Sequence, residues 1–144
     1  MKRVIFGAVS VWALASAAVA HSGATGVVKE RMDRFEASKD SAKVLRGAVK
    51  SADFAAIEAE AVALNAWASE MLEYFPEGSG GSPSEALDTV WSDWDGFSAK
   101  AGDYEMATAK LVSAAQSQDA AATASAFKAV MGSCKGCHDD YKAD

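Results

Sequence analysis

Apolar positions recur at intervals of three and four residues in four segments of the chain, which is the pattern of amphipathic helices. The first segment covers about residues 25–50, the second runs from Ser51 to Phe75, the third from Ser84 to Leu111, and the fourth from Asp119 to Tyr141. Ser51, Ser84 and Asp119 are residue types that favour helix N-caps. A loop rich in glycine, serine and proline, 76–83, separates the second and third segments. No segment alternates as a strand would, so the pattern predicts an all-α four-helix bundle.

The N-terminal segment has the character of a secretory signal peptide. Lys2 and Arg3 precede an uncharged run that ends in Ala18-Val19-Ala20, and a positive start, an apolar middle and a small-x-small ending are typical of such signals. A retained membrane anchor is the alternative, but the run is short for a membrane span. We therefore expect residues 1–20 to be removed and 21–144 to form one exported domain, periplasmic in a Gram-negative bacterium and free of the membrane.

Composition narrows the classes of function. Of the 144 residues, 50% are hydrophobic and 24% are charged, with a formal net charge of −6. An acidic chain without a basic cluster is a poor partner for nucleic acid. The sequence shows no general base, nucleophile or cleft of the kind that hydrolytic enzymes need, so we do not expect an enzyme. Its two cysteines and two histidines are also too few for a disulfide scaffold or a multi-histidine metal centre.

The pentapeptide Cys134-Lys135-Gly136-Cys137-His138 carries the clearest chemistry. Residues i, i+3 and i+4 share one face of a helix, so two thiols there can add to the two vinyl groups of one porphyrin. The next histidine can then serve as an axial ligand of the iron. The C-x-x-C-H signature therefore predicts one covalently attached haem c, held by Cys134 and Cys137, with His138 bound to iron.

Two other interpretations of this pentapeptide are weaker. A structural zinc site needs about four ligands, and His21 at the far end of the chain is a poor fourth. A dithiol redox pair usually opens a helix that follows a strand, whereas no strand is predicted here.

Any sixth iron ligand must come from the first three helices. Only six residues follow His138, and none is methionine. Met32, Met71 and Met106 are the candidates, although methionine on a helix usually fills a core. Met131 shares the fourth helix with His138 and would lie on the wrong side of the haem plane.

The chain resembles the class II cytochromes c, most closely cytochrome c', over His21–Asp144. The resemblance rests on the C-terminal C-x-x-C-H followed by 139–142 (Asp-Asp-Tyr-Lys), on 27–31 (Val-Val-Lys-Glu-Arg), on Phe75 with its glycine-rich loop, and on 91–93 (Trp-Ser-Asp). This family implies an antiparallel four-helix bundle, commonly a homodimer, with haem near one end.

The resemblance also assigns roles to individual residues. Arg31 would pair with a haem propionate, and Ser82 would lie in the loop near the propionates. Phe35 stands where the family has a residue that covers the distal side of the haem, and phenylalanine cannot ligate iron, so we expect five-coordinate iron. Met32 departs from the polar residue usual at its position. Lys142 would place a cation on the proximal side.

Two functions are compatible with such a pocket. An apolar distal side suits NO and CO, which need no hydrogen-bond donor, and a haem protein can also pass single electrons to redox partner proteins. A low-spin His/Met cytochrome with Met32 as the sixth ligand is the alternative. A helical bundle without haem, serving binding or structure, is the hypothesis from a different class.

Overall fold

The computed structural model describes residues 23–143, so the predicted signal peptide lies outside the described residues. Its elements are α1 (Gly26–Ser51), α2 (Phe54–Glu70), the 3₁₀ helix η1 (Met71–Tyr74), α3 (Thr89–Ser92), α4 (Trp94–Gln116) and α5 (Ala120–Tyr141). Within residues 23–143 there is no strand, only one isolated bridge between Ala86 and Lys142. No helix in this part of the chain is long and apolar enough to cross a bilayer.

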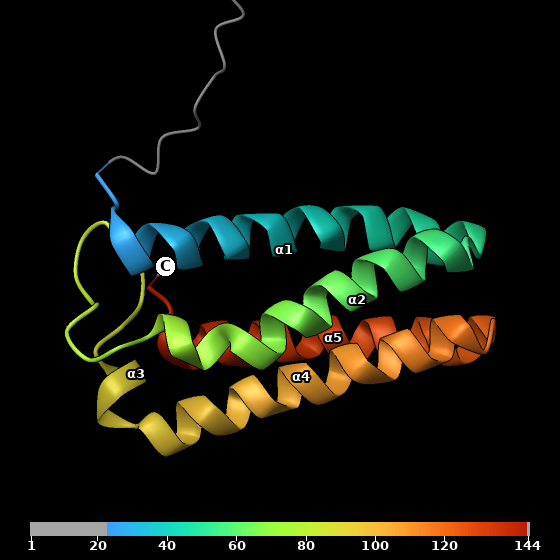
Figure 1. Cartoon of the computed structure of the whole chain (residues 1–144). Helices are drawn as coiled ribbons and strands as arrows, with labels where there is room; N and C mark the ends of the chain where they lie inside the picture. Colours follow the sequence, from blue (N-terminus) through green and yellow to red (C-terminus); the bar gives the residue numbers. More distant parts are fainter. Residues whose placement is uncertain (1–22, 144) are drawn as a thin grey trace, which may run out of the picture.

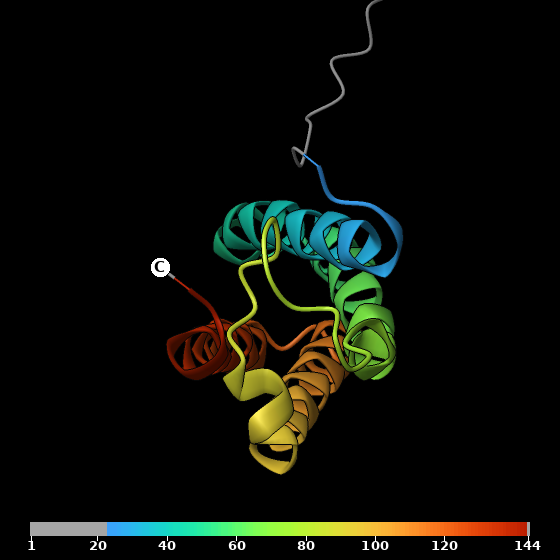
Figure 2. The ribbon, with the colours of Figure 1, turned by 90° about the vertical axis from the view of Figure 1, so that its left-hand side faces the viewer.

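The four long helices form an antiparallel bundle, as predicted. Figure 1 shows α1 and α4 running in one direction and α2 and α5 returning in the other. Seen along the bundle in Figure 2, α4 lies between α2 and α5, and the long loop before α3 crosses the end of the bundle. Contacts are densest between α4 and its neighbours α2 and α5. That end of the bundle also carries the C-terminus of α5.

Aspartates begin three of the long helices. The side chains of Asp53, Asp93 and Asp119 accept hydrogen bonds from the backbone N–H three residues later, which satisfies a donor that the helix leaves free. The Asp119 cap confirms the sequence prediction. Ser51 and Ser84 are not caps: Ser51 is the last residue of α1, and Ser84 lies in the loop. The predicted third helix is accordingly split, because Asp93 ends α3 and caps α4.

The core changes character along the bundle. Toward the end where α1 passes into α2 and α4 into α5, the core contains fully buried aliphatic side chains, among them Leu45, Ile57 and Leu111. Toward the loop end the core is aromatic, with edge-on contacts that link Phe75 to Phe97 and Phe97 to Tyr141. Such edge-to-face pairs stabilise beyond their buried area. The aromatic end is the end that carries the last turns of α5.

Candidate haem site

The two cysteines project toward the core from the last turns of α5. Cys134 and Cys137 are half-buried, pack against the hydrophobic core and are not joined to each other. Tyr141 continues the same stripe of the helix and is buried. His138, one position after Cys137, is more exposed than either thiol. The helix therefore presents two sulfurs and one imidazole at neighbouring positions near its C-terminal end.

Burial sets the protonation of these three groups. It raises the pKa of the Cys137 thiol to about 11 and raises the pKa of Cys134 as well. Partial desolvation, followed by the charge of Lys142, lowers the pKa of His138. At neutral pH the site thus holds two protonated thiols and a neutral imidazole, and the neutral form is the one that binds metal.

Phe35 reaches this site from α1. Its ring centroid lies 6.5 Å from that of His138, in an edge-on arrangement, and 5.4 Å from that of Trp67. Met32, one turn earlier, is half-buried. Of the other methionines considered as ligands, Met71 is buried in the core and Met106 is 56% exposed. The residue that α1 brings opposite the imidazole is therefore the phenylalanine.

Arg31 is buried to 2% exposure and binds the loop. Its Nη1 donates to the Tyr74 carbonyl (3.1 Å) and to Ser79 Oγ (2.8 Å). Its Nη2 donates to the Ser79 carbonyl (2.5 Å) and to Ser84 Oγ (2.6 Å). The guanidinium also lies 4.6 Å from the centre of the Phe75 ring. All four acceptors are neutral, and burial lowers the pKa of Arg31. A carboxylate at this point would compensate a buried charge.

Sequence reasoning missed Ser79 and Ser84. It singled out Ser82, which is exposed in the same loop. The signal that could have found the other two was weak: a loop rich in serine offers several hydroxyls, and only the folded chain selects those that reach a buried arginine. The Arg31 contacts span 43 to 53 residues of sequence.

Lys142 follows the last helical residue. Its Nζ lies 3.0 Å from a Glu85 carboxylate oxygen, and its N–H donates to the His138 carbonyl (3.2 Å). The cation therefore stands on the His138 side of the site, where it also disfavours a second positive charge on the imidazole.

One buried donor near the site lacks an acceptor within the described residues. Trp67 is 3% exposed, its Nε1–H has no hydrogen-bond partner there, and its ring packs on Phe35. Buried donors are nearly always paired, so this N–H is suited to a group that brings its own acceptor.

The side chains of this site fit a covalently bound haem. They comprise two thiols on one helix face, a neutral imidazole and an apolar ring opposite it. Within residues 23–143, no group of three or more histidine, cysteine or acidic side chains is placed so that it could hold a metal ion.

The antiparallel bundle and its C-x-x-C-H place the chain in the class of helical-bundle c-type cytochromes. A family model described as Cytochrome C' matches residues 26–142. The chain belongs to the cytochrome c' family, whose members bind covalent haem c.

Individual relatives agree with this family. A cytochrome c' of Pararhodospirillum photometricum is 37% identical over 121 residues, covering 80% of this chain and 94% of that protein. A cytochrome c' of Rhodospirillum rubrum is 38% identical over 71 residues, 49% of this chain and 48% of the relative, so this match spans about half of its length. Among solved structures, a nitric oxide complex of a cytochrome c prime variant from Alcaligenes xylosoxidans has a TM-score of 0.75 and 28% identity, covering 82% and 94% of the two chains.

Proposed function

We propose that this chain is an exported cytochrome with five-coordinate haem iron that binds NO or CO and passes single electrons. The observation that carries the proposal is the position of Phe35, whose ring lies opposite the His138 imidazole and cannot ligate iron. The low-spin alternative with Met32 is not favoured. The bound haem would supply the iron that changes oxidation state and takes up small ligands.

The residues would divide the work as follows. The thiols of Cys134 and Cys137 would each add across a vinyl group, forming one carbon–sulfur and one carbon–hydrogen bond without any oxidant. His138 would hold the iron from the proximal side, with Lys142 as a nearby cation. Arg31 and the loop that contains Ser82 would lie at the propionates, where a guanidinium is a good donor to a carboxylate.

The distal side would select ligands by its lack of polarity. Phe35 packs against Trp67 and Phe75, so a ligand there would enter an aromatic environment and would have to pass the Phe35 ring. NO and CO tolerate such a site because neither needs a hydrogen-bond donor to bind ferrous haem. The structural neighbour solved as a nitric oxide complex supports this choice of ligand.

Export and dimer formation complete the proposal. Residues 1–20 would direct the chain to the periplasm, leaving 21–144 as the mature domain. Val44 on α1 and Val62 on α2 are 48% and 49% exposed, which supports a homodimer through the first two helices. Sedimentation of wild type and of Val44→Lys tests this: a dimer in the wild type that the charge disrupts is expected, and a monomeric wild type contradicts it.

Spectroscopy of the mature protein tests the haem proposal. We expect a mass one haem above the polypeptide, a high-spin ferric spectrum and uptake of CO by the ferrous form. A low-spin spectrum that does not change when CO is added would contradict five-coordinate iron. The spectrum of Met32→Ala would then show whether Met32 is the sixth ligand. The bare polypeptide mass, after expression with haem-attachment machinery, would overturn the whole proposal.

A further inference from the structure

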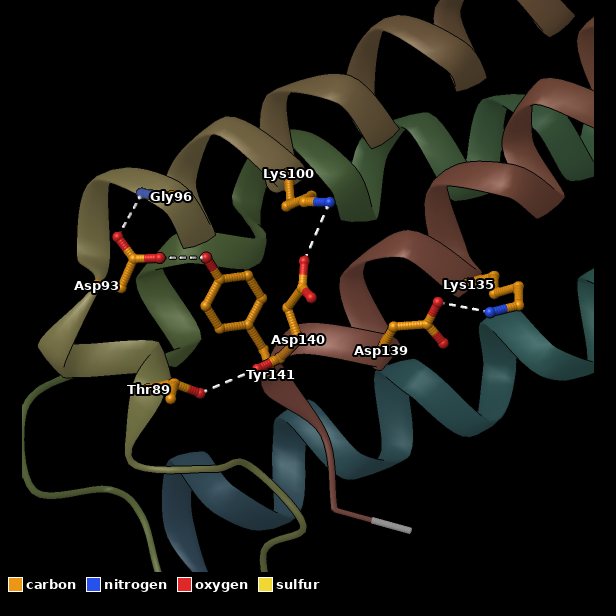
Figure 3. A network of polar contacts seen from close by, with 8 residues as sticks. All are labelled: Thr89, Asp93, Gly96, Lys100, Lys135, Asp139, Asp140 and Tyr141. Atoms are coloured by element: carbon orange, nitrogen blue, oxygen red, sulfur yellow. Dashed lines mark hydrogen bonds and ion pairs between the residues drawn. The ribbon is translucent and has the colours of Figure 1, made fainter.

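The end of α5 is joined to the start of α4 through one carboxylate. Tyr141 Oη donates to Asp93 Oδ2 (2.7 Å), and Asp93 Oδ1 accepts from the Gly96 N–H (3.3 Å), as Figure 3 shows. The Tyr141 side chain is 6% exposed and packs edge-on against Phe97, with ring centroids 5.3 Å apart. A single aspartate thus caps α4 and also accepts a hydrogen bond from the buried phenol of Tyr141 on α5. A hydrogen bond to a charged group is stronger than one between neutral groups.

Gly96 leaves the space that this contact needs. A Cβ atom built on Gly96 would lie 2.5 Å from Tyr141 Oη and closer still to the Asp93 carboxylate. By contrast, a Cβ on Gly102, farther along α4, would meet no atom within 4 Å. Glycine within a helix costs about 1 kcal/mol relative to alanine. At position 96 the close approach of Asp93 and Tyr141 is a physical reason to keep it.

Further contacts hold the main chain beyond His138. Thr89 Oγ1 donates to the Asp140 carbonyl (3.0 Å), and the Leu87 N–H donates to the Tyr141 carbonyl (3.0 Å). Lys100 pairs with the Asp140 carboxylate (3.1 Å), as Figure 3 also shows. The ion pair is exposed and worth little, whereas the Tyr141 phenol is buried. The phenol is therefore the contact on which we expect the geometry to depend most.

His138 lies within the turn that these contacts hold. Tyr141 follows it by three residues, about 4.5 Å along the helix axis, and the His138 carbonyl accepts from the N–H of Lys142. The last turn of a helix frays when nothing outside it holds it. Fraying from Tyr141 would break that hydrogen bond and release the backbone of His138.

We propose that Asp93, Gly96 and Tyr141 form a positioning unit that sets the orientation of the His138 imidazole and thereby its bond to the haem iron. This inference rests on the proposed function, because it assumes that His138 is the axial ligand. None of the three residues is itself proposed as an iron ligand. They act through the last turn of α5.

Holoprotein variants test the unit. In Tyr141→Phe the ring stays and the hydrogen bond is lost; in Gly96→Ala the new methyl group displaces Asp93 or Tyr141. For both we expect the iron–histidine stretching band of the ferrous protein to broaden and move to lower frequency. Gly102→Ala is the matched control, with an unchanged band. Asp93→Asn can still cap α4 and contact the phenol, so it should preserve the band better than Asp93→Ala.

The possible outcomes separate this inference from the function on which it rests. If Tyr141→Phe and Gly96→Ala lower the free energy of unfolding but leave the band as in the wild type, the contact is only structural and the inference fails. A band that shifts equally in Gly102→Ala also overturns it. If the wild type carries no haem, the proposed function itself fails, and the mass of the protein shows this before any variant is compared.

Discussion

The ring of Phe35 on α1 lies opposite the imidazole of His138 on α5, with centroids 6.5 Å apart and planes inclined by 71°. Two helices far apart in sequence thus bring an apolar ring close to the histidine that we propose as the iron ligand. The ring is itself held edge-on by Trp67 and Phe75. Phe35 thus lies among aromatic side chains on the side of the site that faces His138.

Replacing Phe35 should open the distal side. In Phe35→Ala we expect CO to bind the ferrous protein about tenfold faster, which corresponds to about 1.4 kcal/mol of barrier. Stopped-flow mixing with CO measures this rate. Phe35→Met should instead give a low-spin spectrum, since a thioether would then face the iron.

Met32→Ala is the matched control for Phe35. It removes a side chain from the same helix, one turn away, and should leave both the spectrum and the CO rate unchanged. A rate in Phe35→Ala equal to that of the wild type would mean that another group covers the distal side.

The sequence predicted the long helices because their stabilisation is local and periodic. It misplaced boundaries where tertiary contacts decide. Ser84 is a good N-cap by type, but its hydroxyl accepts a hydrogen bond from Arg31. The chain is not helical from Ser84 to Leu87, whose N–H donates to the Tyr141 carbonyl at the end of α5. Asp93 then becomes the cap, which divides the predicted third helix into α3 and α4.

In the candidate site, too, the sequence predicts the residues that are neighbours in the chain but not those that only the fold brings together. Cys134, Cys137 and His138 form a contiguous motif, so their proximity needs no knowledge of the fold. The burial of Arg31 follows from a loop more than forty residues away, and periodicity alone favours a solvated arginine at that position. The Asp93–Tyr141 contact cannot be predicted from the sequence either, because it depends on the space that Gly96 leaves by lacking a side chain.

Arg31 should contribute strongly to stability. Arg31→Met leaves four acceptors without their donor, and one unsatisfied buried group costs about 1–3 kcal/mol. We expect the free energy of unfolding to fall by about 3 kcal/mol, measured by urea denaturation of the holoprotein. Arg31→Lys should not restore the wild-type free energy of unfolding, since an ammonium group lacks the planar set of donors of a guanidinium. Arg46→Met, at an exposed position of α1, should change stability by less than about 0.5 kcal/mol; an equal loss there would contradict this role for Arg31.

Alkaline pH should weaken the contact between α4 and α5. The hydrogen bond to Asp93, together with burial, raises the pKa of Tyr141 to about 12, whereas a free tyrosine titrates near 10. The folded state therefore holds this proton more tightly than the unfolded chain does. Its contribution to stability is complete below about pH 10 and is lost as the pH rises toward 12. Urea midpoints of wild type and Tyr141→Phe should converge over this range, and a constant difference would argue against the contact.

The junction between α1 and α2 offers a stabilising substitution. Ala52 ends α1 with a φ of 53° and a ψ of 39°, a left-handed conformation that costs an L-residue about 1–2 kcal/mol. Glycine adopts it freely and is the usual residue at this point of a helix end. We expect Ala52→Gly to raise the free energy of unfolding by about 0.5–1 kcal/mol, net of the extra chain entropy of glycine. Ala59→Gly, at an exposed position inside α2, should lower it by about 1 kcal/mol. If both substitutions destabilise the protein equally in urea denaturation, the left-handed conformation of Ala52 carries no strain.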